Sequence, residues 1–174
     1  MTSRFLQLGL LLALPMAGLA KEDAVERLLK EQFDNTPAVQ SLSVTGSVAA
    51  ACREILGRDG TPKRIVYYAG AEGTLWVMSA RGKHGPIKAG FVVFEGRIRS
   101  ARILADREKR GRPIRSERYL KQYEGAGLND RGRLNERVDG ITGATISSSA
   151  VEKMARLALR LSALTGSRDS KKAE

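Results

Sequence analysis

The chain has 174 residues, enough for one domain with a short extension. Lysine and arginine outnumber aspartate and glutamate by 30 to 19, and the formal net charge of +11 favours acidic partners such as phosphates, anionic lipids or acidic proteins. The single cysteine, Cys52, excludes an internal disulfide and a thiolate-bound iron–sulfur cluster. The single histidine, His84, has no thiol or carboxylate cluster near it in sequence, so neither a metal site nor a catalytic triad is indicated.

Residues 1–20 have the features of a secretory signal peptide. Arg4 precedes an apolar run, and the small residues of "AGLA" end it with a plausible cleavage point after Ala20. The run is short for a membrane-spanning helix, which needs about 20 apolar residues. We therefore expect export to a bacterial periplasm, and the alternative is an uncleaved membrane anchor.

A helical segment is predicted over residues 21–60. Four apolar residues of "KEDAVERLLKEQF" recur at helical spacing, namely Val25, Leu28, Leu29 and Phe33. After the break at "DNTP", Thr45 or Ser47 is placed to cap a second helix that runs to Leu56, and Gly57 is placed to end it. Cys52 lies in the small-residue apolar stretch of this helix, where a packed core thiol is the simplest interpretation.

Residues 61–165 are predicted to form the main domain, which begins with an antiparallel sheet. Runs rich in Val, Ile, Tyr, Phe and Trp, bounded by glycine, cover residues 63–70, 73–82, 85–96 and 96–106. Glu95 and Gly96 are placed at the tip of the last hairpin. The predicted fold class is α+β, with a small antiparallel sheet of about four strands packed with a C-terminal helix and short helices.

A basic run follows the predicted strands. Its cations are Arg107, Lys109, Arg110, Arg112, Arg115, Arg118 and Lys121. Ser116 is placed to cap a short helix through Tyr123, before Gly125. The run is either a solvated face or a functional basic surface. It matches no nucleic-acid-binding motif, and export argues against DNA or RNA as a partner.

The last predicted helix starts at the serines of "ISSSAVEK". Ser149 and Glu152 have the spacing of a capping box, and an apolar stripe continues at helical spacing to Leu164. The remaining residues, 166–174, are predicted to form a disordered tail.

The stretch "DGITGAT", residues 139–145, holds more polar residues than one helix cap needs. A helix N-terminus presents unpaired N–H groups and a partial positive charge, which together suit a phosphate. Thr145 stands just before the predicted helix, and Gly143 and Ala144 leave room around its hydroxyl. The stretch is either a turn alone or the place where a phosphate-bearing ligand is fastened.

"DGITGAT" followed by "ISSSAV" resembles the flavinylation motif of the FMN-binding domain family, which reads Asp, two variable positions, Ser or Thr, then Gly-Ala-Thr. The similarity extends upstream through the predicted strands and through "REKRGRPIRSERYLKQYEG", where Tyr119 and Tyr123 stand at aromatic positions, and it covers roughly residues 63–164. The family includes domains of the Rnf complex G subunit, of the sodium-pumping quinone reductase C subunit and of small periplasmic flavoproteins. The resemblance implies an electron carrier rather than a turnover enzyme.

By this resemblance the last threonine of the motif, Thr145, accepts FMN through the phosphate. A dedicated flavin transferase, which uses FAD and magnesium, makes the bond. The further residues expected at the cofactor are Asp139, Gly140, Thr142, Gly143, Ala144, Ser147, Ser148, Lys83 and Arg110. No catalytic residue or metal ligand is expected.

Side chains for the flavin ring are less well defined by the sequence. Lys88 and Arg112 are further candidate cations, and Tyr68 is a candidate to cover the ring, whereas core packing is the simpler role for Trp76. The expected partners are redox proteins, soluble or membrane-bound. The alternatives are a non-enzymatic basic module for anionic lipid or cell-wall polymer, and a flavin-bearing sensor or assembly factor.

Overall fold

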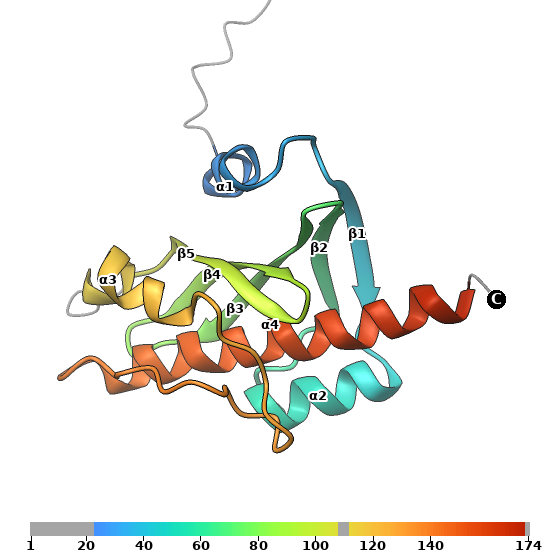
Figure 1. Cartoon of the computed structure of the whole chain (residues 1–174). Coiled ribbons are helices and arrows are strands. Elements are labelled where there is room, and N and C mark those ends of the chain that lie inside the picture. Colours follow the sequence, from blue (N-terminus) through green and yellow to red (C-terminus); the bar gives the residue numbers. More distant parts are fainter. Residues whose placement is uncertain (1–22, 108–111, 173–174) are drawn as a thin grey trace, which may run out of the picture.

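The computed structural model describes residues 23–107 and 112–172, which form a five-stranded sheet with helices on both faces (Figure 1). The strands are β1 (Ala38–Ser43), β2 (Arg64–Gly70), β3 (Gly73–Arg81), β4 (Pro86–Phe94) and β5 (Arg97–Ala105). The helices are α1 (Ala24–Gln32), α2 (Gly46–Leu56), α3 (Glu117–Leu120) and α4 (Thr145–Lys172), and the 3-10 turns are η1 (Arg112–Arg115) and η2 (Lys121–Tyr123). The predicted signal peptide lies outside the described residues.

The sheet is an antiparallel meander in the order β1-β2-β3-β4-β5, and the predicted α+β fold class is confirmed. The predicted hairpin tip is also confirmed, because Glu95 and Gly96 both have positive φ, 48° and 72°. Two successive positive φ values make a type I′ turn, whose twist matches the twist of the paired strands.

The sequence predicted about four strands, and two helices within residues 21–60. Both helices are present as α1 and α2, and the structure adds a fifth strand, β1, between them. The β1 residue Leu42 is buried opposite Ile65 of β2, while Val39 is 66% exposed. A six-residue edge strand with one buried side chain has little periodic signal of its own. Pairing with the distant β2 therefore decides its structure.

Helices cover the two faces of the sheet unequally (Figure 1). On one face, α1 packs Val25 and Leu28 against Leu75 and Val92 in a small cluster. Two arginines of β5 hold α1 in place: Arg99 donates to the Gln32 carbonyl, and Arg102 pairs with Glu31 at 2.9 Å. The other face, under α2 and α4, carries the main core, which includes Trp76, Phe91, Met154, Leu157 and Leu161.

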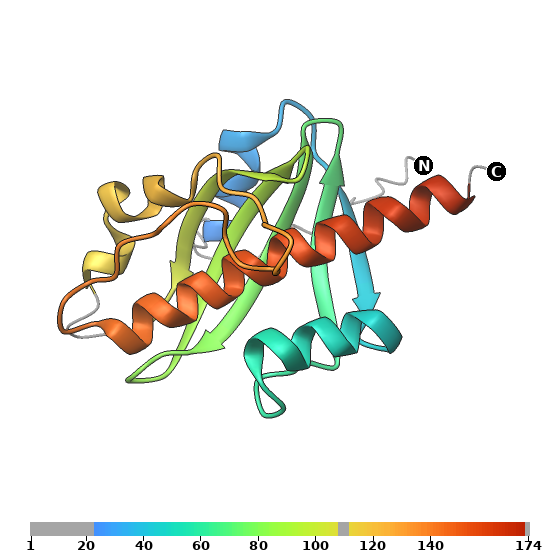
Figure 2. The ribbon, with the colours of Figure 1, turned by 60° about the horizontal axis from the view of Figure 1, so that its bottom comes forward.

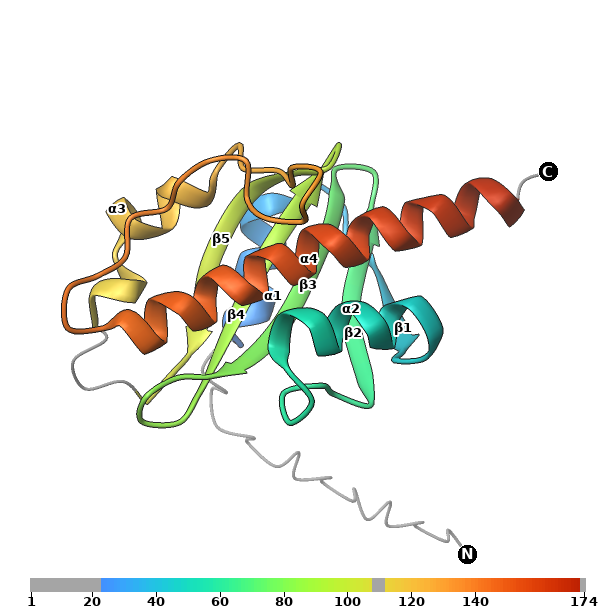
Figure 3. The same cartoon turned by 90° about the horizontal axis from the view of Figure 1, so that it is seen from below.

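Helix α4 crosses the strands diagonally, with α2 beside it (Figure 3). It begins at Thr145, one turn before the predicted start, so the capping-box prediction for Ser149 is wrong and Ser149 lies inside the helix. It also continues to Lys172, where the sequence predicted a disordered tail from residue 166. A glycine at 166 lowers helix propensity but does not end a helix that is already propagating. Within the described residues no helix combines the length and the apolar character needed to cross a membrane.

The chain between η2 and α4 runs out to the middle of α4 and returns to its start (Figure 2). Its far end is fastened where Arg156 Nε donates to the Gly132 carbonyl at 3.0 Å. An isolated antiparallel bridge between Leu128 and Leu134 holds the outgoing and returning parts of this segment together. This path delivers residues 139–145 to the N-terminal end of α4.

Candidate functional site

A tight turn over residues 141–144 precedes α4. The Ala144 N–H donates to the Ile141 carbonyl at 2.9 Å, and Gly143 has a φ of 79°. Thr142 is not among the described residues with positive φ, so the turn has the type II pattern, which requires glycine or asparagine at its third position. The "TG" pair in the sequence therefore has a local structural cause.

The Ser148 hydroxyl joins this turn to the first turn of the helix. It accepts from the Ile141 N–H at 3.1 Å and donates to the Ala144 carbonyl at 3.1 Å. The same Ala144 carbonyl accepts from the Ser148 N–H at 2.9 Å, which begins the helix. Ser148 is only 6% exposed, so its hydroxyl makes these bonds away from bulk water. These buried bonds stabilise the conformation of the loop in front of Thr145.

The segment "YLKQY" supports the turn from the α3 side. Gln122 Oε1 accepts from the Asp139 N–H at 2.8 Å. Tyr119 and Tyr123 join their hydroxyls at 2.8 Å, and the Tyr119 hydroxyl lies 3.4 Å from the Ser148 carbonyl oxygen. Burial raises the pKa of both tyrosines, so both hydroxyls stay protonated as hydrogen-bond donors. The two segments that resemble the family motifs are thus bonded to each other.

The N-terminal end of α4 lacks a side-chain cap. Ala144 occupies the capping position, and an alanine has no oxygen to accept the orphan N–H groups of the first turn. Within the described part of the chain, the N–H groups of Thr145 and Ile146 donate to no acceptor. Thr145 is exposed, so its hydroxyl lies beside free donors at the positive end of the helix dipole. This arrangement favours a phosphate group.

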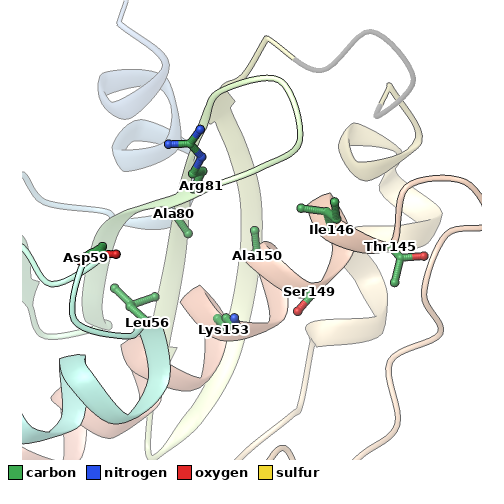
Figure 4. Close-up of a pocket in the computed structure, with 10 residues that line it drawn as sticks. Leu56, Asp59, Ala80, Arg81, Thr145, Ile146, Ser149, Ala150 and Lys153 are labelled. Atoms are coloured by element: carbon green, nitrogen blue, oxygen red, sulfur yellow. The ribbon is translucent and has the colours of Figure 1, made fainter.

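Thr145 also stands at one end of a cavity of about 550 Å³ (Figure 4). The cavity lies between the first turns of α4, the end of β3 and the loop after α2. Its lining residues are Leu56, Asp59, Gly60, Ala80, Arg81, Thr145, Ile146, Ser149, Ala150 and Lys153. A volume of this size lies within the range of small-molecule and cofactor sites.

The lining suits an amphipathic planar ligand. Ile146, although 55% exposed, contributes an apolar side chain at the Thr145 end of the cavity, and Leu56 stands at the opposite end. Lys153 supplies a positive charge that forms no ion pair with any described residue. The Arg81 side chain points away from α4, so the strand end contributes its backbone and Ala80 (Figure 4). The residues present therefore fit a phosphate at Thr145 and an aromatic ring system in the cavity.

The structure brings together only part of the predicted cofactor set. Asp139, Gly140, Thr142, Gly143 and Ala144 lie in the loop that leads to Thr145. Ser147 and Ser148 instead lie in the interior, 1% and 6% exposed, and neither lines the cavity. Lys83, in the exposed β3–β4 connection, is not among the lining residues, and Arg110 lies outside the described residues.

Sequence reasoning missed Ser149 and Lys153 as lining residues. They follow Thr145 at intervals of four residues, which places all three on one face of an α-helix. This signal becomes readable only when the helix is known to begin at Thr145.

Several candidate ring contacts belong to other parts of the fold. Trp76 is fully buried in the main core and stacks on Tyr67 with centroids 4.4 Å apart, so its predicted packing role is confirmed. Tyr68 packs against the α1 cluster, on the face of the sheet opposite α4. Lys88 pairs with Ser79 on that same face. Neither side chain lines the cavity at Thr145.

Much of the positive charge near the basic run is used within the chain. Arg97 donates to the Gly125 carbonyl at 2.8 Å, and Arg115 pairs with Asp106. Lys121 pairs with Glu117 at 3.0 Å, one helical turn away, which lowers the pKa of that carboxyl group. Ser116 caps α3 as predicted, since its hydroxyl accepts from the Tyr119 N–H. Two cations of the run, Arg115 and Lys121, thus form ion pairs within the chain.

The remaining chemistry of the described residues is sparse. Cys52 is fully buried in α2, and burial raises the pKa of its thiol, which makes it a weak nucleophile at neutral pH. Across residues 23–107 and 112–172, no group of three or more histidine, cysteine, aspartate or glutamate residues converges on a point where a metal could bind.

Comparison with known proteins agrees with the geometry. Residues 82–160 match the family model described as the FMN-binding domain, which spans β4, β5, the tyrosine pair, the turn and most of α4. No curated protein matches the chain. Residues 82–160 of the chain thus form a domain of the FMN-binding family.

Proposed function

We propose that the protein is an electron carrier whose FMN is esterified through its phosphate to Thr145. The observation that carries the proposal is the exposed Thr145 hydroxyl at an uncapped helix N-terminus, on the rim of the 550 Å³ cavity, inside the stretch that matches the FMN-binding domain. FMN, when bound, supplies electron-transfer chemistry that no side chain of this protein provides.

Attachment needs a separate enzyme, because a threonine hydroxyl is a poor nucleophile without a base and an activated phosphate. In the proposed step, Thr145 Oγ1 attacks the phosphorus of the FMN half of FAD. The pyrophosphate bond breaks, AMP leaves, and the hydroxyl proton passes to a base of the flavin transferase, with magnesium balancing the phosphate charge. The type II turn presents the hydroxyl outward for this reaction.

The protein's own residues then hold the product. The N–H groups of Thr145 and Ile146 would hold the phosphodiester, whose single negative charge suits the positive end of α4. The Ser148 and Gln122 bonds keep the turn from moving, so the tether starts from a fixed point. We further propose export to the periplasm, as the signal-like residues 1–20 favour, and electron exchange with soluble or membrane-bound redox proteins.

Co-expression with a flavin transferase tests the proposal. We expect a fluorescent band in a denaturing gel that disappears in Thr145→Ala. Thr142→Ala is the matched control, because it removes the other threonine hydroxyl of the motif and leaves the acceptor. A Thr145→Ala protein that still carries flavin through denaturation would contradict the assignment.

A further inference from the structure

We propose that the loop after α2 forms one wall of the binding site of the flavin ring, although this loop lies outside the part of the chain that matches the family. Within this site, Lys153 and Asp59 shift the midpoint potential of the ring in opposite directions. The inference rests on the proposed attachment at Thr145. It concerns where the ring lies and which of this chain's charges act on it.

The first wall of the ring's binding site is one face of α4. Thr145, Ser149 and Lys153 lie at successive four-residue intervals and all line the cavity. With a rise of about 1.5 Å per residue, Lys153 stands roughly 12 Å along the helix from the tether. A ring tethered at Thr145 and lying along this face is therefore directed toward the Lys153 ammonium group.

The second wall is supplied by Leu56, Asp59 and Gly60. Its position is well fixed, because α2 packs Val48 and Ile55 into the core shared with α4. The chain then leaves α2 through a tight loop. Thr61 Oγ1 donates to the Gly57 carbonyl at 2.9 Å, and a β-carbon at Gly60 would stand only 2.8 Å from the Leu56 carbonyl oxygen. This wall faces the Thr145 end across the cavity (Figure 4).

A second cavity lies on the α3 side of the motif, but it fits the ring less well. It is lined by Arg118, Gln122 and Asp139, among others, and does not include Thr145. The cavity under α2 contains the acceptor itself, together with the apolar side chains of Leu56 and Ile146. A flavin ring has an apolar end and a polar end, and of these two cavities the one under α2 offers apolar side chains and the Lys153 cation beside the acceptor threonine itself.

The charged residues of the ring's binding site have predictable effects on the midpoint potential of the flavin. Reduction places negative charge on the ring, and a nearby cation stabilises that charge while a nearby anion opposes it. Lys153 therefore raises the midpoint potential and Asp59 lowers it. Their effects are compared on protein that already carries FMN, so a change in the yield of attachment does not enter the comparison.

The test measures midpoint potentials on protein whose mass confirms one attached FMN. We expect Lys153→Gln to lower the potential and Asp59→Asn to raise it. Arg160→Gln is the control for a lost cation on α4, and Asp34→Asn is the control for a lost carboxylate on the other side of the sheet; neither lines the cavity. Both controls should leave the potential unchanged.

A second measurement reports the ring's position without reference to charge. Quenching of flavin fluorescence by neutral acrylamide should increase in Leu56→Ala, which opens the α2 wall, and not in Leu29→Ala, a half-buried leucine on α1. Unchanged potentials in both charge variants, or equal quenching in Leu56→Ala and the wild type, would overturn the inference while attachment at Thr145 stands. A wild-type chain that gains no FMN mass would instead defeat the proposed function.

Discussion

Removing one hydroxyl of the Tyr119–Tyr123 pair tests whether the pair stabilises the fold beneath the acceptor turn. Tyr123 is fully buried, Tyr119 is 4% exposed, and their hydroxyls lie 2.8 Å apart. The Tyr119 hydroxyl has a second partner, the Ser148 carbonyl at 3.4 Å, whereas Tyr123 has no other partner among the described residues. The two single variants are therefore unequal.

Tyr119→Phe leaves the Tyr123 hydroxyl buried and unsatisfied, which costs about 1–3 kcal/mol of unfolding free energy. Tyr123→Phe costs less, about 1 kcal/mol, because Tyr119 keeps its contact with Ser148. The double Phe variant removes donor and acceptor together, so its cost should fall below that of Tyr119→Phe alone. The expected coupling is about 1–2 kcal/mol, within the range for residues in direct contact.

Urea denaturation of the four proteins, followed by circular dichroism, measures these free energies. In a domain of this size each 1 kcal/mol corresponds to about 2–4 °C in Tm, so thermal melts give an independent check. Strictly additive single-variant costs would show that the two hydroxyls do not form the bond described, and would refute this reasoning.

Three further predictions concern the turn and its supports. Gly143→Ala should lose about 1–2 kcal/mol of unfolding free energy, because a β-carbon is strained at positive φ. Gly140→Ala is the control and should be near neutral in the same urea denaturation experiment, since Gly140 has equally open surroundings and no positive φ. Gln122→Ala should slow flavinylation in a timed transferase assay by freeing the Asp139 N–H, and Gln122→Glu, which keeps an acceptor oxygen, should restore the rate. Because burial raises the pKa of Tyr119 and Tyr123, the unfolding free energy should fall as the pH rises above about 10, where tyrosine in the unfolded chain loses its proton. The unfolding free energy of the double Phe variant should fall less steeply over the same pH range. Identical slopes for the two proteins would contradict this.

Local signals in the sequence predicted the features that depend on neighbouring residues. The Glu95-Gly96 hairpin, the Ser116 cap and the end of α2 at Gly57 each follow from a few adjacent side chains and backbone angles. The start of α4 was missed for the same local reason, since three consecutive serines are all acceptable caps. What decides among them is the bonding of the Ser148 hydroxyl to the turn, which leaves Ala144 at the capping position.

Features that join distant segments could not be predicted. Strand β1 forms because Leu42 finds Ile65 across the pair, and nothing in "AVQSLS" indicates that partner. The cavity likewise combines Leu56 and Asp59 of one segment with Lys153 of another. Resemblance to a family motif indicated Thr145 as the acceptor, but the candidate ring contacts taken from matching segments include Lys88, which faces the wrong side of the sheet.

A mass map of the peptide that holds the motif tests covalent attachment at Thr145 most directly. Trypsin cleaves after Arg137 and Lys153, so one peptide, residues 138–153, carries every hydroxyl of the motif. After co-expression with a flavin transferase, this peptide should gain the mass of one FMN less water, and fragmentation should place it on Thr145. An unmodified peptide from protein that is yellow and fluorescent after denaturation, or a modification placed on Thr142 or a serine, would contradict the account.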